Sequence, residues 1–191
     1  MDAAAVVREV QERRVPLVRL WFTDVLGFLK SFAVPAEELE RALSDGIGFD
    51  GSAIEGFARV EEEDVIARPD PVTFRLLPAR GGDVAARMLC DITYPDGAPF
   101  EGDPRFVLRR NLERARALGY RFVAAPEIEF FLSRSAEQFD PADRGGYFDL
   151  TASDVAEAFR RRTLDALGAL GIAVESVHHE DAPGQQEIDL A

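Results

Sequence analysis

Two glutamates stand two positions apart inside an apolar stretch, Pro126-Glu127-Ile128-Glu129-Phe130. Side chains alternate along a strand, so Glu127 and Glu129 are predicted to share one face, and Ile128 and Phe130 the other. On a buried face, their mutual repulsion and desolvation would require an opposing charge. A hard divalent cation supplies one, because carboxylate oxygens are the ligands that Mg²⁺ and Mn²⁺ prefer. The alternative is an exposed polar face on which each acid pairs with an arginine.

The last residues of the sequence, HHEDAPGQQEIDLA, gather further groups that can bind a metal. Glu180 follows a predicted strand, and Glu187 comes after a Pro-Gly turn. These two carboxylates at the ends of an irregular loop would complete a metal site drawn from two segments. Zinc fits less well, because the chain has no cysteine pair and the adjacent His178 and His179 would face opposite ways on a strand. For each histidine, a hydrogen-bonded structural role is as open as direct ligation.

No other catalytic signature competes with these acids. The sequence has no GxxxxGK[ST] loop, no GxGxxG after a predicted strand and no GxSxG elbow. Nucleotide phosphates would therefore have to be held by metal-binding carboxylates and arginines. Cys90 lies in an apolar stretch and is predicted to be a small core residue rather than a nucleophile.

Composition limits the partners and the compartment. The 191 residues carry a formal net charge of -13, and an acidic surface repels phosphate backbones, so we expect no nucleic-acid partner. The N-terminal residues lack the apolar core of a signal peptide, and no apolar run reaches the length of a membrane span. The single cysteine permits no internal disulfide, which fits a reducing compartment. We expect a cytoplasmic protein without a membrane partner.

The elements that must position these acids fall into two groups. The first half predicts a small α+β unit, because short strand-like runs alternate with one well-bounded helix. Its predicted elements are a helix over residues 3–13, a hairpin around the Asp-Val-Leu-Gly turn at 24–27, a helix that follows Pro35 and ends at Gly46, a long loop over 47–64, two extended pieces over 65–78 and a strand over 85–94.

The second half begins after a turn-rich stretch at residues 95–104, which we take as the domain boundary. The predicted domains are residues 1–98 and 99–191. The second contains a helix capped by Asp103 with Pro104 at its first position, a strand over 121–134, a helix capped by Thr151 or Ser153 that ends at Gly171, and a strand over 172–180 that runs into the acidic tail.

Several motifs together resemble one family. Phe22-Thr23-Asp24 with Gly27 and Lys30, then FDGSAIEGFARVEEEDVIARPDPVTF, then the Glu-Ile-Glu strand and the HHEDAPGQQEID tail, are similar in order and spacing to type I glutamine synthetases. The resemblance covers about residues 15–189. It implies an α+β chain in which a β-grasp-like N-terminal domain precedes an α/β catalytic domain, here incomplete.

The resemblance also implies a reaction and roles for individual residues. The family ligates ammonia to the γ-carboxylate of glutamate through γ-glutamyl phosphate, with ATP as substrate and two Mg²⁺ or Mn²⁺ ions per site. By resemblance, Glu129, Glu180 and Glu187 hold the first ion and Glu127 contributes to the second. Glu175 matches a position near the nucleotide, and Tyr147 matches a tyrosine at the ammonium and glutamate pocket.

Asp50 matches an aspartate that helps to deprotonate ammonium in the active site of a neighbouring subunit. The resemblance thus implies a homo-oligomer of dodecameric rings, with active sites between subunits. From the residues alone, Asp50 would simply belong to an Asp-Gly turn.

Two departures from the family pattern leave alternatives open. Ala53 stands where many members have a second serine, and a less polar pocket could admit a polyamine or another amine in place of ammonia. The family's catalytic domain also continues well beyond the length of this chain, so we expect the 191 residues alone to be inactive. A catalytically inactive structural protein of the same family is the other alternative, although unused buried acids would destabilise a fold.

Overall fold

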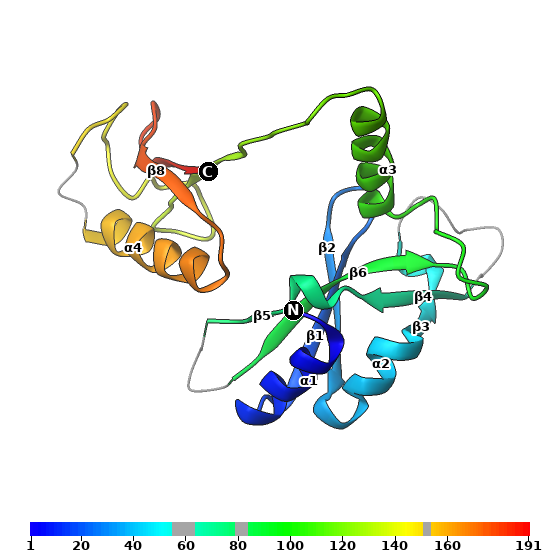
Figure 1. The fold of residues 1–191 in the computed structure, drawn as a ribbon. Helices are drawn as coiled ribbons and strands as arrows, with labels where there is room; N and C mark the ends of the chain where they lie inside the picture. Colours follow the sequence, from blue (N-terminus) through cyan, green and yellow to red (C-terminus); the bar gives the residue numbers. More distant parts are fainter. Residues whose placement is uncertain (55–63, 79–83, 151–153) are drawn as a thin grey trace. The chain divides into compact units, whose positions relative to one another are not determined.

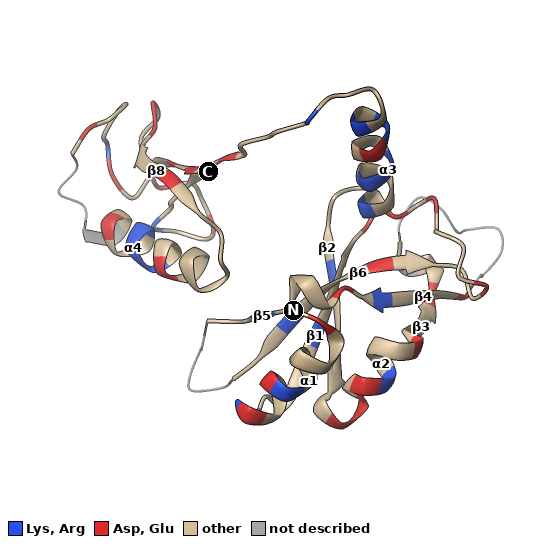
Figure 2. Cartoon of the chain, in the orientation of Figure 1, with Lys and Arg blue, Asp and Glu red and all other residues tan. Residues whose placement is uncertain are grey.

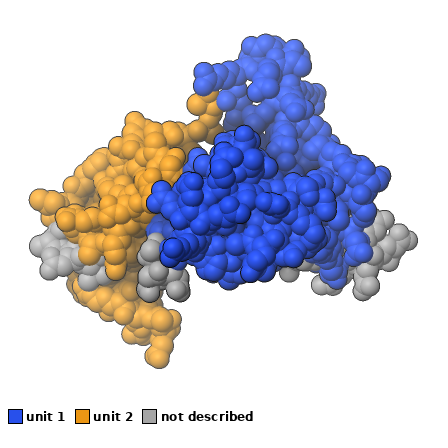
Figure 3. All heavy atoms as spheres, turned by 60° about the horizontal axis from the view of Figure 1, so that its bottom comes forward, with its two compact units in different colours: residues 1–122 blue, residues 123–191 orange. Residues whose placement is uncertain are grey.

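The computed structural model describes residues 1–54, 64–78, 84–150 and 154–191 (Figure 1). The chain divides into two compact units, coloured separately in Figure 3: unit 1 is Met1–Phe122 and unit 2 is Val123–Ala191. Both units contain strands and helices, which agrees with the predicted α+β class. None of the helices in the described ranges combines the length and the apolar character needed to cross a membrane.

A mixed sheet forms the centre of unit 1, in the order β2-β1-β6-β4-β3, with β5 also paired to β6. Its strands are β1 (Leu17–Thr23), β2 (Leu29–Pro35), β3 (Ile47–Asp50), β4 (Asp64–Pro69), β5 (Arg75–Leu76) and β6 (Ala86–Thr93). β1 and β2 form the predicted antiparallel hairpin, whereas β1 runs parallel to β6. Burial alternates residue by residue along β1, β4 and β6, so one face of the sheet supplies the core.

Two helices, α1 (Ala3–Glu12) and α2 (Leu39–Asp45), pack beside each other against this sheet (Figure 1). The Asp2 carboxylate caps α1 by accepting a hydrogen bond from the Ala5 amide at 2.8 Å. A 3-10 turn, η1 (Ala36–Glu38), leads into α2. Gly46 ends α2 with a φ of 78°, and a Cβ there would lie 2.4 Å from the Ile66 side chain, so glycine is required.

The prediction of a long loop over residues 47–64 is wrong at its start. Residues Ile47–Asp50 form β3, which pairs antiparallel with β4 so that Ile47 lies opposite Ala67. Four residues are too few to show an alternating pattern, so only the pairing with β4 reveals this strand. The turn η2 (Gly51–Ala53) follows, and residues 55–63 lie outside the described part of the chain.

The helix α3 (Pro104–Ala117) begins where the sequence predicts it. The Asp103 carboxylate accepts hydrogen bonds from the Arg105 amide at 2.9 Å and from the Ile92 amide at 3.0 Å, which ties the helix to β6. Arg105 then bridges Asp70, after β4 and before η3 (Pro71–Thr73), and Asp91 on β6, at 2.6 and 2.7 Å. Figure 2 shows in blue the basic residues along α3.

Unit 2 is built on a three-stranded antiparallel sheet in the order β7-β9-β8. Its elements are β7 (Glu127–Phe131), α4 (Asp154–Ala169), β8 (Val174–His179) and β9 (Gln185–Leu190). The sequence predicts an irregular loop from Glu180 to Glu187, and this is wrong at its end, because the chain folds back from Gln185 as β9 and becomes the central strand. The cap predicted at Thr151 or Ser153 lies outside the described residues.

Candidate metal centre

The register of unit 2 gathers four acidic residues and one histidine from three strands on one face. Glu129 on β7 lies opposite Glu187 on β9, and Glu187 lies opposite His178 on β8. In the next row along the strands, Glu127 lies opposite Asp189. We call these five residues the acidic face. They are 62 or fewer positions apart in sequence but become neighbours because β9 is inserted between β7 and β8.

The opposite face of the same sheet packs on α4 and fixes this register. The rings of Phe130 on β7 and Phe159 on α4 lie 5.3 Å apart, and Ile188 on β9 is buried. Arg160 on α4 donates a hydrogen bond to the buried side chain of Gln186. A slip of one residue would exchange the two faces and remove every carboxylate of β9 from the acidic face.

A cavity of about 570 Å³ opens on the acidic face. Its lining combines the three strands with the loop before α4 and the loop after β8, and consists of Ala125, Glu127, Glu129, Tyr147, Phe148, Glu175, Ser176, His178, Glu180, Glu187, Asp189 and Leu190. Six carboxylates and one imidazole therefore surround one cavity, which is the donor set of a site for hard cations.

His178 sits among three of these carboxylates. Its Nε2 lies 3.2 Å from Oε2 of Glu187 and 3.4 Å from Oε1 of Glu180, and its Nδ1 lies 3.7 Å from Oδ2 of Asp189. Although both ring nitrogens are buried, neither makes a well-formed hydrogen bond within the described residues. The ring of Phe148 stacks on the imidazole at 4.5 Å. Buried nitrogens without a hydrogen bond are what a missing ligand would leave behind.

The charges at the cavity are unbalanced without a cation. Burial, together with the contacts with Glu180 and Asp189, raises the pKa of Glu187 to about 7. The pKa of Glu180 is lowered, first of all because its carboxylate accepts a hydrogen bond from the Asp181 amide. Glu187 is thus the carboxyl that keeps a proton, and a divalent cation would replace that proton. Burial, together with Glu180 and Glu187, also raises the pKa of Tyr147.

Two overlapping groups of side chains meet the spacing of a metal site. The ligand atoms of His178, Glu180 and Glu187 lie within 4.8 Å of one another, and so do those of Glu127, Glu187 and Asp189. Glu187 belongs to both groups, so the two groups share one carboxylate. The buried, unsatisfied imidazole and the carboxylate set therefore fit one or two hard divalent cations.

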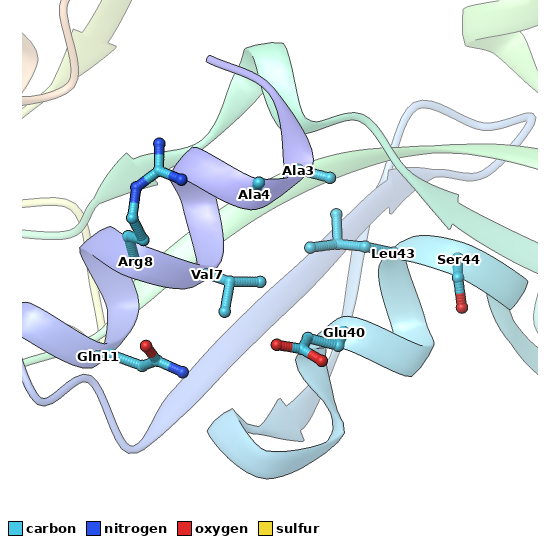
Figure 4. Close-up of a pocket in the computed structure, with 8 residues that line it drawn as sticks. All are labelled: Ala3, Ala4, Val7, Arg8, Gln11, Glu40, Leu43 and Ser44. Carbon is cyan, nitrogen blue, oxygen red and sulfur yellow. The ribbon is translucent and has the colours of Figure 1, made fainter.

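A second cavity, of about 470 Å³, lies in unit 1 between α1 and α2 (Figure 4). Its lining is mixed: Ala3, Ala4, Val7, Arg8, Gln11, Glu40, Leu43 and Ser44. It offers one carboxylate and one guanidinium, with apolar side chains between them, and it lacks any cluster of metal ligands among the described residues. The acidic face of unit 2 therefore remains the candidate centre.

Comparisons with known proteins agree with this arrangement. Residues 14–95 match the glutamine synthetase β-grasp domain, and residues 101–191 match the glutamine synthetase catalytic domain. The glutamine synthetase of Mycolicibacterium smegmatis is 56% identical over 97% of this chain and 43% of that protein. That of Thermus thermophilus is 47% identical over 98% of this chain and 44% of that protein.

The chain belongs to the glutamine synthetase family. It spans less than half the length of these relatives. The fold of a Plasmodium falciparum glutamine synthetase superposes with a TM-score of 0.81 at 23% identity, covering 100% of this chain and 44% of that one. A structure of a GmaS/ADP complex superposes with a TM-score of 0.80 at 26% identity, over 97% of this chain and 43% of that one.

The glutamine synthetase match confirms the predicted fold, in which a β-grasp domain precedes the catalytic-domain fold. Six of the residues predicted for the site line the one cavity on the acidic face: Glu127, Glu129, Tyr147, Glu175, Glu180 and Glu187. Asp50 lies in unit 1 at the end of β3, where its carboxylate accepts a hydrogen bond from the Ser52 amide at 2.8 Å. That bond lowers the pKa of Asp50, and it is the Asp-Gly turn arrangement.

The structure decides between the two faces that the sequence left open for Glu127 and Glu129. Glu127 and Glu129 do share a face, but they are exposed, and the buried carboxylate is Glu187, which is 7% exposed. The partner of Glu129 is not an arginine but the Gln185 amide, at 2.7 Å. A bulge in β8 between Val174 and Ser176 explains how Glu175 joins its neighbour Ser176 at the cavity, because the extra residue breaks the alternation of side chains.

Sequence reasoning missed Asp189 and Phe148, and it left the role of His178 open. Asp189 follows the same alternation as Gln185 and Glu187, so recognising QQEIDL as a strand would have placed it on the acidic face. Phe148 has a φ of 60°, and no sequence pattern near it predicts this backbone conformation.

Proposed function

We propose that the whole protein carrying this chain is an ATP-dependent ligase that joins ammonia to the γ-carboxylate of glutamate through γ-glutamyl phosphate. One observation supports this most strongly: a chain 56% identical to a glutamine synthetase folds so that Glu180, Glu187 and His178 converge on one cavity. The reaction is proposed for the whole protein, since the relatives are more than twice as long as this match.

The acidic residues are proposed to hold two Mg²⁺ or Mn²⁺ ions. Glu129, Glu180 and Glu187 are assigned to the first ion, and Glu127 to the second. His178 lies with Glu180 and Glu187 in one of the two groups of closely spaced ligand atoms, and Asp189 lies with Glu127 and Glu187 in the other. The ions would supply charge compensation for the transferred phosphoryl group, since phosphoryl transfer depends on positioning and on neutralising negative charge.

The other predicted residues are proposed to handle the substrates. Tyr147, at the edge of the same cavity, would contact glutamate and the amine, and Glu175 would lie near ATP. Asp50 would help to deprotonate ammonium from a neighbouring subunit, in an assembly of dodecameric rings. Its carboxylate is exposed and its pKa is lowered by the Ser52 amide, so it is ionised and available to accept a proton at neutral pH.

A second acceptor class is proposed because of one residue. By the family resemblance, Ala53 stands where many members have a second serine, which would make the amine pocket less polar. The side chain of Ala53 lies outside the described residues. A polyamine or another alkyl amine is therefore the alternative acceptor.

The decisive experiment measures the γ-glutamyl product and phosphate release by the protein expressed from its complete coding sequence. It is supplied with glutamate, ATP, Mg²⁺ or Mn²⁺, and either ammonia, methylamine or putrescine. Product with ammonia supports the proposal, and product only with an alkyl amine replaces the acceptor. Glu129→Gln should lower turnover by at least about tenfold, whereas Glu137→Gln, an exposed glutamate outside the cavity, should not change it.

A protein that binds Mn²⁺ but forms no product with any amine would instead support the inactive, structural alternative. Mn²⁺ binding that survives Glu187→Gln would contradict the metal assignment itself.

A further inference from the structure

Behind the candidate metal centre lies a buried polar pair that does not line the cavity. His179 is 2% exposed and Asp143 is 7% exposed. Nε2 of His179 lies 2.6 Å from Oδ1 of Asp143, and Nδ1 lies 2.6 Å from the carbonyl oxygen of Glu180. One imidazole ring therefore links the loop before α4 to the backbone of a proposed metal ligand.

The carboxylate of Asp143 accepts two further hydrogen bonds, one from each of the two linked segments. Its Oδ1 accepts hydrogen bonds from the Gly145 amide at 3.1 Å and from the Gly184 amide at 3.2 Å. The Phe148 amide, in turn, donates to the carbonyl oxygen of His179 at 3.0 Å. The segment 143–148, which carries Tyr147, is thus fastened to the loop 180–184, which carries Glu180.

The segment 143–148 and the loop 180–184 are closely packed where they meet. Gly184 has a φ of 75°, and a Cβ there would lie 2.9 Å from the Leu132 carbonyl oxygen and 3.3 Å from the Ala142 nitrogen. Phe148 adopts a φ of 60°, a conformation that costs free energy for a residue other than glycine and persists only when its surroundings hold it. Its hydrogen bond to His179, its ring stack on His178 and its ring contact with Tyr147 hold it in this conformation.

We propose that Asp143 and His179 form a positioning pair, which holds Tyr147 and Glu180 in a fixed relation on the cavity. This rests on the proposed function, since it assigns a purpose to the geometry of that same site. Two buried polar side chains cost free energy that an apolar pair would not. The hydrogen bonds they make are directional, however, and fix two loops that have few apolar side chains to lock them.

The two hydrogen bonds of His179 can be separated by substitution. In His179→Asn, the side-chain amide nitrogen takes roughly the place of Nδ1, so the bond to Glu180 can persist while the bond to Asp143 is lost. In His179→Gln, the amide nitrogen takes roughly the place of Nε2, so the opposite bond persists. Asp140→Asn, an exposed aspartate three positions before Asp143, is the matched surface control for Asp143→Asn.

The experiment uses the protein from its complete coding sequence, with two readouts that need no turnover: Mn²⁺ affinity by electron paramagnetic resonance, and hydrogen exchange of the peptide containing residues 143–149. His179→Asn should speed exchange of this peptide at least about tenfold with Mn²⁺ affinity within about threefold of wild type. His179→Gln should lower Mn²⁺ affinity about tenfold and leave the peptide protected. Where product forms, His179→Asn should raise the KM for the amine more than it lowers kcat.

This crossed pattern is the expected result. If both variants change both readouts together, or neither variant changes either, the pair is merely structural and the proposal is overturned. If neither histidine variant folds, Asp143→Asn decides: it should speed exchange of residues 143–149 without weakening Mn²⁺, and equal weakening of both overturns the proposal. Lack of Mn²⁺ binding by the wild type would refute the proposed metal site, while the exchange of residues 143–149 would still test the link to His179.

Discussion

The two units of the molecule differ in the side chains that they bury in their interiors. Unit 1 has one apolar cluster, to which α1, α2 and most strands contribute, with Leu20 and Met88 among its fully buried side chains. The buried side chains described in unit 2 include only Ala142, Ala156 and Ile188 as apolar ones, beside the polar Asp143, His179, Gln186 and Glu187. Apolar burial stabilises a unit wherever it occurs, whereas polar burial stabilises it only if every group finds its partner.

A second contrast, between two buried carboxylates, shows what the polar interior is for. Asp24 in unit 1 is fully buried, but Lys30 lies 3.1 Å away and the Leu26 and Phe28 amides donate to it at 3.0 and 2.9 Å. Glu187 in unit 2 is similarly buried but faces other carboxylates. The charge of the first acid is offset within its own hairpin by Lys30, whereas the charge of the second would be offset by a proton or by a cation.

The largest expected effect tests the apolar interior. Leu20→Ala should destabilise unit 1 by about 3–5 kcal/mol, because it removes a fully buried leucine and leaves a cavity. Chemical denaturation followed by the fluorescence of Trp21, the only tryptophan of the 191 residues, measures this. The matched control, Leu29→Ala, removes a side chain that is 55% exposed and should cost less than about 0.5 kcal/mol. Equal losses in the two variants would contradict a core centred on Leu20.

The next effect should appear in unit 2 alone. A ligand that binds only the folded state stabilises it by about 2.7 kcal/mol at one hundred times its dissociation constant. Saturating Mn²⁺ should therefore slow hydrogen exchange of β8 and β9 about a hundredfold and leave β1 and β6 unchanged. Glu187→Gln should abolish this protection. Protection spread equally over both units would mean that the cation is not confined to the acidic face.

A smaller effect concerns the polar partners on the far side of the same sheet. Gln186→Leu should destabilise unit 2 by about 2 kcal/mol, because Arg160 loses its buried acceptor. Adding Arg160→Met should recover most of that loss, since both polar partners are then replaced by apolar groups. Exchange of the β9 amides measures both variants. Arg160 keeps its contact with Glu157 at 3.2 Å, so a double variant that is no more stable than Gln186→Leu would show that packing, rather than the lost Gln186 acceptor, carries the cost.

The parts of the fold that were predictable are those whose cause is local. Asp103 followed by Pro104 predicts the start of α3 because capping needs only neighbouring residues, and the hairpin around Gly27 follows from its turn residues. β3 and β9 were missed because their order comes from pairing. β9 resembles a polar tail until β7 and β8 are seen on either side of it.

The site shows the same division. Glu127 and Glu129 were placed on one face by alternation alone, and Glu180 and Glu187 by their spacing around a turn. The link between Asp143 and His179 joins residues 36 positions apart, and no spacing rule predicts it. The burial of Glu187 and the exposure of Glu127 also depend on strand order, so the sequence suggested the acids but not which of them would need a cation most.

The smallest effects are pH dependences of opposite sign, and they begin with Asp24. Burial would raise the pKa of Asp24, but the hydrogen bonds from Phe28, Lys30 and Leu26 outweigh it, so the pKa lies below the ordinary value of 3.8. The stability it contributes is present above that value and is lost as the pH falls through the lowered pKa. Asp24→Asn should therefore flatten the acid side of the unfolding curve of unit 1, measured as Tm below pH 4. An unchanged acid slope would show that Lys30 and the two amides do not select the ionised form.

Glu187 should behave in the opposite way in the metal-free protein. Its pKa is raised from 4.5 to about 7, first by burial and then by Glu180 and Asp189. Its contribution to the stability of unit 2 is complete below the ordinary value and is lost as the pH rises through about 7. Exchange of the β9 amides, corrected for the intrinsic pH dependence, should thus accelerate between pH 5 and 8, and Glu187→Gln should remove that acceleration. Because a cation replaces the proton, saturating Mn²⁺ should remove it as well. One outcome would separate titration from metal binding: Glu187→Gln removes the acceleration, but Mn²⁺ leaves it in place. The carboxyl group of Glu187 would then titrate as described without binding the metal. Glu187 and Asp24 would differ in their buried surroundings alone.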